Sequence, residues 1–565
     1  MVRLSFTKVV LCLAAGVFAG AAWGAEATGQ LETLQQAEQF TEHDQWPEAA
    51  AAWQRVVDVN PHLGRAWRNL GTARLHIKEF DKAIPAFAKA LELGSGYRFD
   101  AACNIARCYA QLGDKQRALD WLQKSLDFGY RRLDQIREDK DLQPLKDDER
   151  FKRMAAVVDV SHMSRDEGWR YDLDLLAREI KRAHYSPFRK ISRQEFDLEV
   201  DKLRREIPQL SDNQIMVGLR RIIRRVGDGH SGISSPHGPD APKELAPVEF
   251  YLFAEGVFIT SAHPRHADLA GAQVLRIGGH PVEEVVQALD QVIPQDNSMG
   301  LLWLSPLFLR YPRVLNGLGM VPDDKSLPMT VRGAQGKERD VILPADSAEP
   351  EPSWISARKN APAPEPLYLK KQRDPYWFEY VPEKKLVYFQ YNQVWEEGQK
   401  ETIKQFSERL FKFIDQNDVA RLVIDMRWNG GGNNFLNEPI VHGLIRCDKV
   451  NQKGKLFVIV GRDTFSAAMC GAAQIERETN AIFVGEPTGS SPNFVGESAV
   501  MVKLPYSNLR ASISDLYWEN SVAMDYRTWI PPQIYAPPTF AMFRANRDPA
   551  MEAILAYRGE KGGEK

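Results

Sequence analysis

The stretch "KLFVIVGRDTFSAAMCGAA", residues 455–473, places a serine between an apolar run and an alanine-rich segment. The apolar run predicts a buried strand and the segment after it predicts a helix, with Ser466 on the turn between them. Many hydrolases hold a nucleophilic serine on such a strand-to-helix turn. A serine that simply caps the helix would suit the same place. The sequence leaves both interpretations open.

A nucleophilic serine needs a neighbouring base to accept its proton. The candidate is His230 in "GDGHSG", where flanking glycines indicate a turn that can bring an imidazole to another element. Imidazole titrates close to neutral pH and therefore suits general base catalysis. The chain has 11 histidines, so His230 is chosen for its turn and not for its rarity.

The triple glycine of "RWNGGGNN" offers backbone N–H groups that no side chain shields. Beside a nucleophile, Gly430 and Gly431 could stabilise the oxyanion of acyl transfer, together with the N–H of Ala467 at the start of the next helix. A phosphate-binding loop is the other interpretation of three glycines. The G-x-x-x-x-G-K-[ST] pattern of such a loop is absent.

Residues 371–565 alternate between apolar runs and amphipathic segments, which predicts a mainly parallel sheet covered by helices. The loops "RWNGGGNN", "GRDTFS" and "PTGSSPN" each follow one of the runs. Loops that leave the carboxyl ends of parallel strands lie along the same edge of the sheet, where ligands usually bind. The strand order alone therefore brings the glycines and Ser466 together.

Residues 30–155 show internal repetition. The segments "PEAAAAWQRVVDVNP", "DKAIPAFAKALELG" and "QRALDWLQKSLDFG" align, and Ala49, Ala83 and Ala118 recur at intervals of 34 and 35 residues. This period resembles the tetratricopeptide repeat family, and it predicts an all-α solenoid of stacked helix pairs. The concave face of the solenoid could bind a partner protein, or the repeats could only brace the next domain.

The remaining boundaries follow changes of pattern. Residues 165–240 predict a helical cap that carries the His230 loop, and residues 241–345 predict a β-rich subdomain. "GVFITSA" and "AGAQVLRIGGHPV" in that subdomain resemble a PDZ module. Residues 346–370, rich in proline, alanine and glutamate, predict a linker.

Composition and the first residues indicate where the protein acts. Residues 1–24 have the three-part pattern of a signal peptide, with cleavage near Gly24, which predicts a periplasmic or secreted protein without a membrane anchor. The formal net charge of −2 gives no reason to expect nucleic-acid binding. The cysteines show no metal-ligand spacing, so we expect no metal or cofactor. The sequence does not decide whether Cys447 and Cys470 form a disulfide.

Several motifs together resemble the tail-specific, or C-terminal-processing, serine peptidases. They are "LVIDMRWNGGGNN", "VIVGRDTFSAA", "FVGEPTG" and the closing "DYRTWIPPQI", and the resemblance runs from about residue 165 to the end. It implies a crotonase-like α/β peptidase core. It also implies that Ser466 is the nucleophile, with an oxyanion hole around Gly430 or Gly431 and Ala467, and that the substrate is a polypeptide.

The chain departs from the processing-protease branch of that family at one position. That branch places a lysine base in a "GKG" turn after the serine, whereas the matching turn here is "TGSSPN", with Ser491 at the place of the lysine. The chain is more similar to the tricorn-core and interphotoreceptor-retinoid-binding branch, whose tricorn-type sites use serine, histidine and an acid. The resemblance then implies that His230 is the base and Asp525 the orienting acid. Asp228 is the alternative acid, and Asp425 is expected to be structural.

The leading hypothesis is an exported serine peptidase whose repeats recruit substrate or a partner protein. A catalytically inactive scaffold of the same fold, which binds a peptide or an apolar ligand, is the alternative from another class. An esterase would share the chemistry and differ in its pocket.

Overall fold

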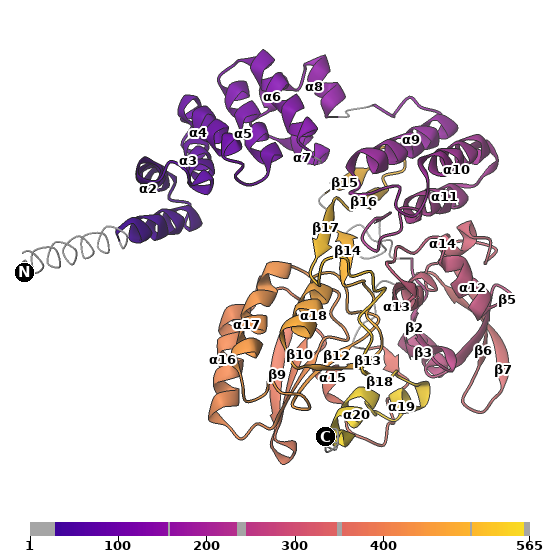
Figure 1. Cartoon of the computed structure of the whole chain (residues 1–565). Helices are drawn as coiled ribbons and strands as arrows, with labels where there is room; N and C mark the ends of the chain where they lie inside the picture. Colours follow the sequence, from indigo (N-terminus) through magenta and orange to yellow (C-terminus); the bar gives the residue numbers. More distant parts are fainter. Residues whose placement is uncertain are drawn as a thin grey trace, which may run out of the picture. The chain divides into compact units, whose positions relative to one another are not determined.

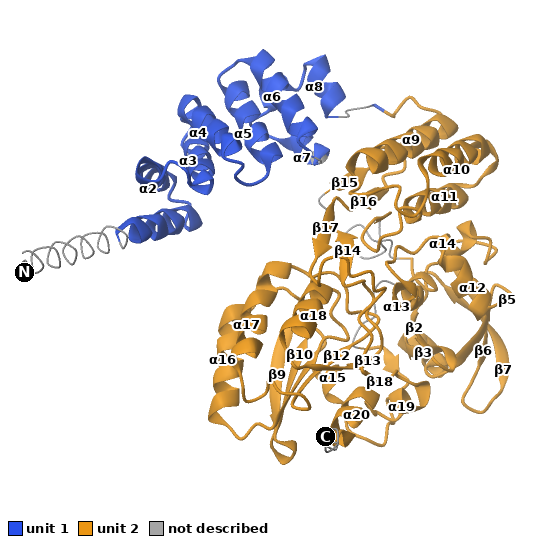
Figure 2. Cartoon of the chain, in the orientation of Figure 1, with its two compact units in different colours: residues 1–159 blue, residues 160–565 orange. Residues whose placement is uncertain are grey.

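The computed structural model describes residues 29–130, 132–155, 159–233, 244–346, 353–497 and 500–558. The predicted signal peptide, residues 1–24, lies outside the described residues. The chain divides into two compact units, residues 1–159 and 160–565 (Figure 2). Among the described residues, no helix combines the length and the apolar character that a membrane crossing requires.

The first unit is helical, as the sequence predicts (Figure 1). Ala49, Ala83 and Ala118, the residues that mark the repeat, are fully buried, which lets neighbouring helices approach closely. The first described helix ends at residue 42. The others are α2 (Trp46–Val59), α3 (Gly64–His76), α4 (Phe80–Glu92), α5 (Arg98–Gln111), α6 (Lys115–Asp127), α7 (Leu133–Glu138) and α8 (Glu149–Met154).

The second unit begins with a cap of three helices, α9 (Arg165–Ala183), α10 (Arg193–Glu206) and α11 (Asp212–Arg224). Each starts with a capping box, at Ser164, Ser192 and Ser211. After α11 the chain turns through His230 into β1 (Gly232–Ile233). This short strand pairs with β16 (Arg510–Ile513), which in turn pairs with β15 (Val500–Lys503). The His230 turn is therefore anchored to a segment near the C-terminus.

The β-rich subdomain is built on an antiparallel sheet in the order β2-β3-β4-β6-β7. Its apolar face packs on helices that follow β4 and precede β6. The strands are β2 (Val248–Phe253), β3 (Gly256–Ala262), β4 (Gln273–Ile277), β5 (His280–Pro281), β6 (Ser326–Arg332) and β7 (Glu338–Pro344), and the helices are α12 (Val282–Leu289), α13 (Ser298–Phe308) and α14 (Pro312–Gly317).

The predicted linker, residues 346–370, is packed where the structure describes it. Strand β8 (Ile355–Ser356) pairs with β3 of the β-rich subdomain. Helix α15 (Leu367–Lys370) buries Tyr368. The proline content indicates a break in regular structure, but it does not show whether the chain is covered.

The core of the second unit is a six-stranded sheet in the order β18-β13-β12-β11-β10-β9, parallel except for β9 at its edge. Three helices, α16, α17 and α18, pack on one face, and α20 packs on the other. The bounds are β9 (Tyr376–Val381), β10 (Leu386–Tyr391), β11 (Arg421–Asp425), β12 (Leu456–Val460), β13 (Ile482–Gly485), β18 (Ile534–Tyr535), α16 (Ile403–Gln416), α17 (Glu438–Arg446), α18 (Ala467–Glu478), α19 (Phe540–Arg544) and α20 (Pro549–Ala556).

A separate antiparallel pair, β14 (Asn493–Gly496) and β17 (Leu516–Glu519), stands beside this core. The predicted fold class is confirmed: a helical repeat region precedes a helical cap, a β-rich subdomain and an α/β core. Five short 3₁₀ helices complete the regular structure among the described residues: η1 (Gln143–Leu145), η2 (Ile207–Gln209), η3 (Pro264–Leu269), η4 (Pro382–Lys384) and η5 (Asn434–Asn437).

Candidate active site

Ser466 occupies the turn between β12 and α18 in a backbone conformation that L-residues rarely adopt, with φ +53° and ψ −125°. Such a conformation costs about 1–3 kcal/mol and persists only where the surrounding structure enforces it. The serine side chain makes no capping hydrogen bond to α18. The helix-capping interpretation of Ser466 is therefore wrong, and its hydroxyl is directed elsewhere.

The turn is held from inside the sheet by Thr464, whose side chain is fully buried. Its hydroxyl donates to the carbonyl of Met426 (2.9 Å) and accepts from the N–H of Gly461 (3.1 Å). The N–H of Phe465 donates to the carbonyl of Asn429 (3.1 Å). These bonds link the serine turn to the end of β11 and to the glycine loop that follows it.

The hydroxyl of Ser466 meets the ring of His230. Nε2 of His230 lies 2.9 Å from Oγ of Ser466. The ring lies between two phenylalanines, with its centroid 4.4 Å from that of Phe465 and 5.3 Å from that of Phe494, both in stacked geometry. Packing on two apolar faces therefore holds the imidazole in place.

This packing changes the chemistry of His230. Burial lowers its pKa to about 4, although the negative charge of Asp228 opposes that shift. The ring is therefore neutral at pH 7, as a general base must be. Nδ1 is buried and has no hydrogen-bond partner among the described residues.

The glycine loop packs directly against the serine turn. A Cβ at Gly431 would lie 2.6 Å from Cβ of Ser466 and 2.9 Å from the nitrogen of Ala467. The N–H of Gly431 donates to Oδ1 of Asn429 (3.0 Å), so in this state it is not directed at a substrate. Ala467 is the first residue of α18, and its N–H belongs to the orphan donors of a helix start. Of the three predicted oxyanion donors, only the N–H of Gly431 is thus engaged by a side chain of the glycine loop.

The structure does not bring Asp525 to His230. The Asp525 carboxylate accepts hydrogen bonds from the Ser521 hydroxyl (2.7 Å) and from the Arg527 guanidinium (2.8–3.1 Å). The bond from Arg527, with that from Ser521, lowers the pKa of Asp525 to about 2. Arg527, two residues along the chain, therefore binds the carboxylate of Asp525, which the sequence predicted to orient His230. Asp425, expected to be structural, accepts from Tyr388 and Arg427.

Two other carboxylates contact the His230 turn. Oδ1 of Asp228 accepts from the backbone N–H of His230 (2.8 Å). Asp296, which the sequence analysis missed, accepts from the N–H of Gly229 (2.8 Å) and from the hydroxyl of Ser490 (2.5 Å). Burial raises the pKa of Asp296 to about 6. No motif surrounds Asp296, and only the fold brings its loop to the turn.

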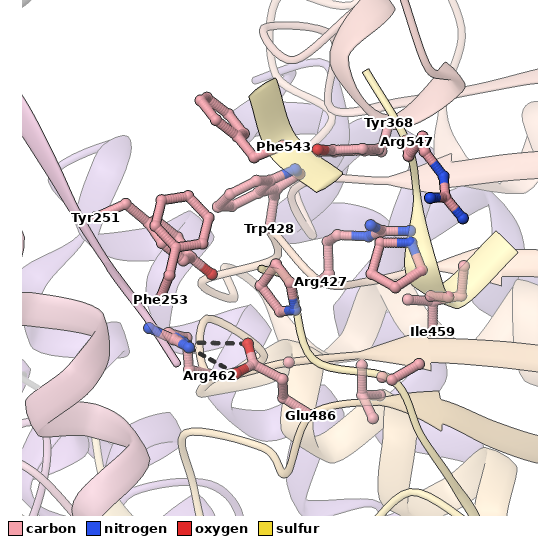
Figure 3. A pocket seen from close by; sticks show the side chains of 17 residues that line it. Tyr251, Phe253, Tyr368, Arg427, Trp428, Ile459, Arg462, Glu486, Phe543 and Arg547 are labelled. Carbon is pink, nitrogen blue, oxygen red and sulfur yellow. Dashed lines mark hydrogen bonds and ion pairs between the residues drawn. The ribbon is translucent and has the colours of Figure 1, made fainter. Parts of the chain in front are cut away.

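A cavity of about 80 Å³ lies at the carboxyl ends of β11, β12 and β13 (Figure 3). Neither Ser466 nor His230 lines it. Its wall contains the buried ion pair between Arg462 and Glu486, in which two nitrogens meet two oxygens at 3.1 and 2.5 Å. Arg462 also donates to the carbonyl of Leu252 in β2 (2.8 Å). Arg462 therefore ties the β-rich subdomain to the turn that carries Ser466.

The described residues contain no group of three His, Cys, Asp or Glu side chains that could hold a metal ion. The expectation of no metal or cofactor stays a prediction from the sequence. Cys447 and Cys470, between which the sequence allows a disulfide, are both buried free thiols.

Comparison with known proteins gives one match to a family model. Residues 62–129 match the tetratricopeptide repeat, which confirms the predicted repeats over that part of the chain. No curated protein matches the sequence.

Three solved structures illustrate what the chain is similar to. The structure of mature CPAF complexed with lactacystin is 12% identical, covers 69% of this chain and 97% of its own, and gives a TM-score of 0.48. The photosystem II D1 C-terminal processing protease is 15% identical, with coverages of 68% and 98% and a TM-score of 0.34. The N-terminal domain of stress-induced protein-1 from C. elegans is 14% identical, with coverages of 23% and 93% and a TM-score of 0.17. The chain contains a tetratricopeptide repeat region, and its structural similarity to the other proteins named here is distant.

Proposed function

We propose that the protein is a serine peptidase that hydrolyses polypeptides through an acyl-enzyme on Ser466, with His230 as the general base. The observation that carries this proposal is the 2.9 Å approach of His230 Nε2 to Ser466 Oγ. The serine there has a strained backbone conformation at the start of a helix. Backbone strain of this kind is concentrated at functional sites.

The geometry supports a standard acyl-transfer sequence. Ser466 Oγ attacks the carbonyl carbon of the scissile bond while Nε2 of His230 takes its proton. The oxyanion that forms would accept hydrogen bonds from the N–H groups of Ala467 and Gly430. The imidazolium then gives the proton to the leaving amine. In the second half of the reaction, His230 takes a proton from a water molecule that attacks the acyl ester, and it returns this proton to Oγ of Ser466.

The proposal extends to the setting of the reaction. Residues 1–24 would direct export to the periplasm or outside the cell, and the repeats would bind a protein, either the substrate or a partner. A polypeptide is proposed as the substrate because a serine activated by a histidine suits the hydrolysis of an amide bond.

A fluorophosphonate probe tests the proposal directly. The intact protein should react with the probe at Ser466, located by peptide mass spectrometry, and should cleave unfolded casein. His230→Gln should slow both reactions by ~10²–10⁴-fold, because it removes the general base. A folded wild-type protein that neither reacts with the probe nor cleaves casein would favour the inactive scaffold. Cleavage of small acyl esters without cleavage of casein would favour the esterase.

A further inference from the structure

In the proposed reaction, the imidazolium of His230 has no evident negatively charged partner. When His230 takes the proton of Ser466, its ring becomes a cation between two phenylalanine faces. A buried cation without a compensating charge is costly. No carboxylate among the described residues hydrogen-bonds to Nδ1 of His230, so a compensating charge must act from elsewhere.

Asp228 lies beneath the histidine turn with its side chain fully buried. Its Oδ1 atom accepts three hydrogen bonds, from the N–H of His230 (2.8 Å), the N–H of Ser231 (2.6 Å) and the hydroxyl of Ser514 (2.8 Å). Two of these donors belong to the backbone that carries the imidazole. The carboxylate therefore fixes the path of the main chain at the base itself.

The other oxygen of Asp228 contacts a second buried histidine. Nε2 of His184 lies 2.9 Å from Oδ2 of Asp228. Nδ1 of His184 accepts from the N–H of Ser186 (3.0 Å). Because a nitrogen that accepts carries no proton, the proton of His184 sits on Nε2 and the ring is neutral. The pair therefore keeps a single negative charge, on Asp228.

Asp228 remains ionised in this setting. Burial would raise its pKa, but the hydrogen bonds from His184, Ser514 and the N–H of Ser231 oppose burial and lower its pKa. Its negative charge in turn raises the pKa of His230 against the effect of burial. Asp296, the other carboxylate at the turn, has a raised pKa and bonds to Gly229, not to the residue that carries the ring.

We propose that Asp228, held by His184 and Ser514, is the positioning carboxylate of the site. It fixes the His230 turn through the main chain, and its charge stabilises the imidazolium that forms during acyl transfer. This role differs from that of an acid hydrogen-bonded to the ring, and it rests on the proposed function.

The test compares two isosteric substitutions of buried carboxylates. Asp228→Asn removes the charge and keeps the size. Asp172→Asn is the matched control, because Asp172 is equally buried and accepts two backbone N–H bonds, from Tyr506 and Ser507. The measured quantities are the rate of fluorophosphonate reaction at Ser466, kcat and KM on a peptide, and the dependence of the reaction rate on pH.

We expect Asp228→Asn to slow the reaction at Ser466 and to lower kcat by about 10- to 100-fold, less than the ~10²–10⁴ of a general base. KM should not change, because the imidazolium forms only during the reaction. The pH at which activity is lost on acidification should fall, since the charge that raises the pKa of His230 is gone. Asp172→Asn should change none of these quantities.

Substitutions at His184 give an independent check if Asp228→Asn fails to fold. His184→Leu removes a donor to the carboxylate and should slow the reaction, whereas His184→Gln keeps a neutral donor and should restore it. Reaction at the wild-type rate in folded Asp228→Asn, or in His184→Leu, would overturn the inference alone. A wild-type protein without reaction at Ser466 would overturn the proposed function, and the role of Asp228 with it.

Discussion

Ser466 and His230 are 236 residues apart in the chain, yet Oγ of the serine and Nε2 of the histidine lie 2.9 Å apart. The two residues lie on different structural elements of the second unit. Ser466 stands at the end of a core strand, whereas His230 lies on a turn between the helical cap and a strand that pairs near the C-terminus.

Ser466→Gly should abolish activity and raise stability. Glycine adopts a positive φ without steric cost, so the substitution should relieve part of a strain of about 1–3 kcal/mol. Ser466→Ala should also be inactive but should gain no stability, because alanine keeps the strain. The absence of a capping bond means that alanine loses little there. Urea unfolding of the three proteins measures the difference, and a glycine variant no more stable than the alanine variant would contradict the strain.

The reaction with a fluorophosphonate should persist well below neutral pH. A general base is active when neutral, so activity is present above the pKa of His230 and is lost as the pH falls through about 4. The unperturbed value for histidine, ~6.5, would have predicted a loss between about pH 6 and 7.5.

Two carboxyl groups near the turns titrate in that range and need their own controls. Burial raises the pKa of Asp296 to about 6 and that of Asp463 to about 7. The pH profile is therefore measured in Asp296→Asn and Asp463→Asn as well. A loss of activity near pH 6.5 that remains in both variants and disappears in His230→Gln would show that the pKa of His230 is not lowered.

Gly431→Ala should lower activity by ~10²-fold or more, because small displacements at a reacting centre have effects of that size. The new Cβ would lie 2.6 Å from Cβ of Ser466 and would displace the serine turn or the glycine loop. Gly398→Ala is the control, since Gly398 also has a positive φ but has nothing within 4 Å of the added atom. Both variants place alanine at a positive φ, but only Gly431→Ala brings the new Cβ against Ser466. The ratio of their kcat/KM values therefore measures the effect of that contact. Equal activities would show that the loop adapts.

Arg462→Met should destabilise the second unit by ~3–5 kcal/mol, because it leaves Glu486 buried without its partner. The double variant Arg462→Met with Glu486→Gln should recover part of the loss. Arg547→Met, which breaks the exposed pair with Glu552, is the control and should leave the urea midpoint unchanged. A loss in Arg462→Met no larger than in the control would show that Arg462 does not hold the β-rich subdomain to the core.

The sequence predicted those parts of the molecule that depend on local pattern. The 34-residue period, the strand-to-helix turn at Ser466 and the glycine-flanked turn at His230 are each visible within a short stretch. The sequence does not predict the pair β14 and β17, although Phe494 of β14 packs on the imidazole of His230. Its strands have four residues each, too few to show a period.

The choice of acid failed for a different reason. Asp525 was chosen from a family position, but Arg527 and Ser521 engage its carboxylate within the same loop. Asp228, close to His230 in sequence, acts on the turn through backbone N–H groups and a buried histidine 44 residues away. Such a role depends on which donors converge on a buried carboxylate, and no residue spacing reveals that.

The pairing of β1 with β16 has a consequence for the synthesis of the protein. Ser512 donates to the carbonyl of His230 (2.9 Å), and Ser514 donates to Asp228. A chain whose translation stops between residues 480 and 510 already carries Ser466 and its helix, but it lacks the strand that anchors the histidine turn. Because the proposed general base would lose its anchor, we expect such a truncated chain to be inactive.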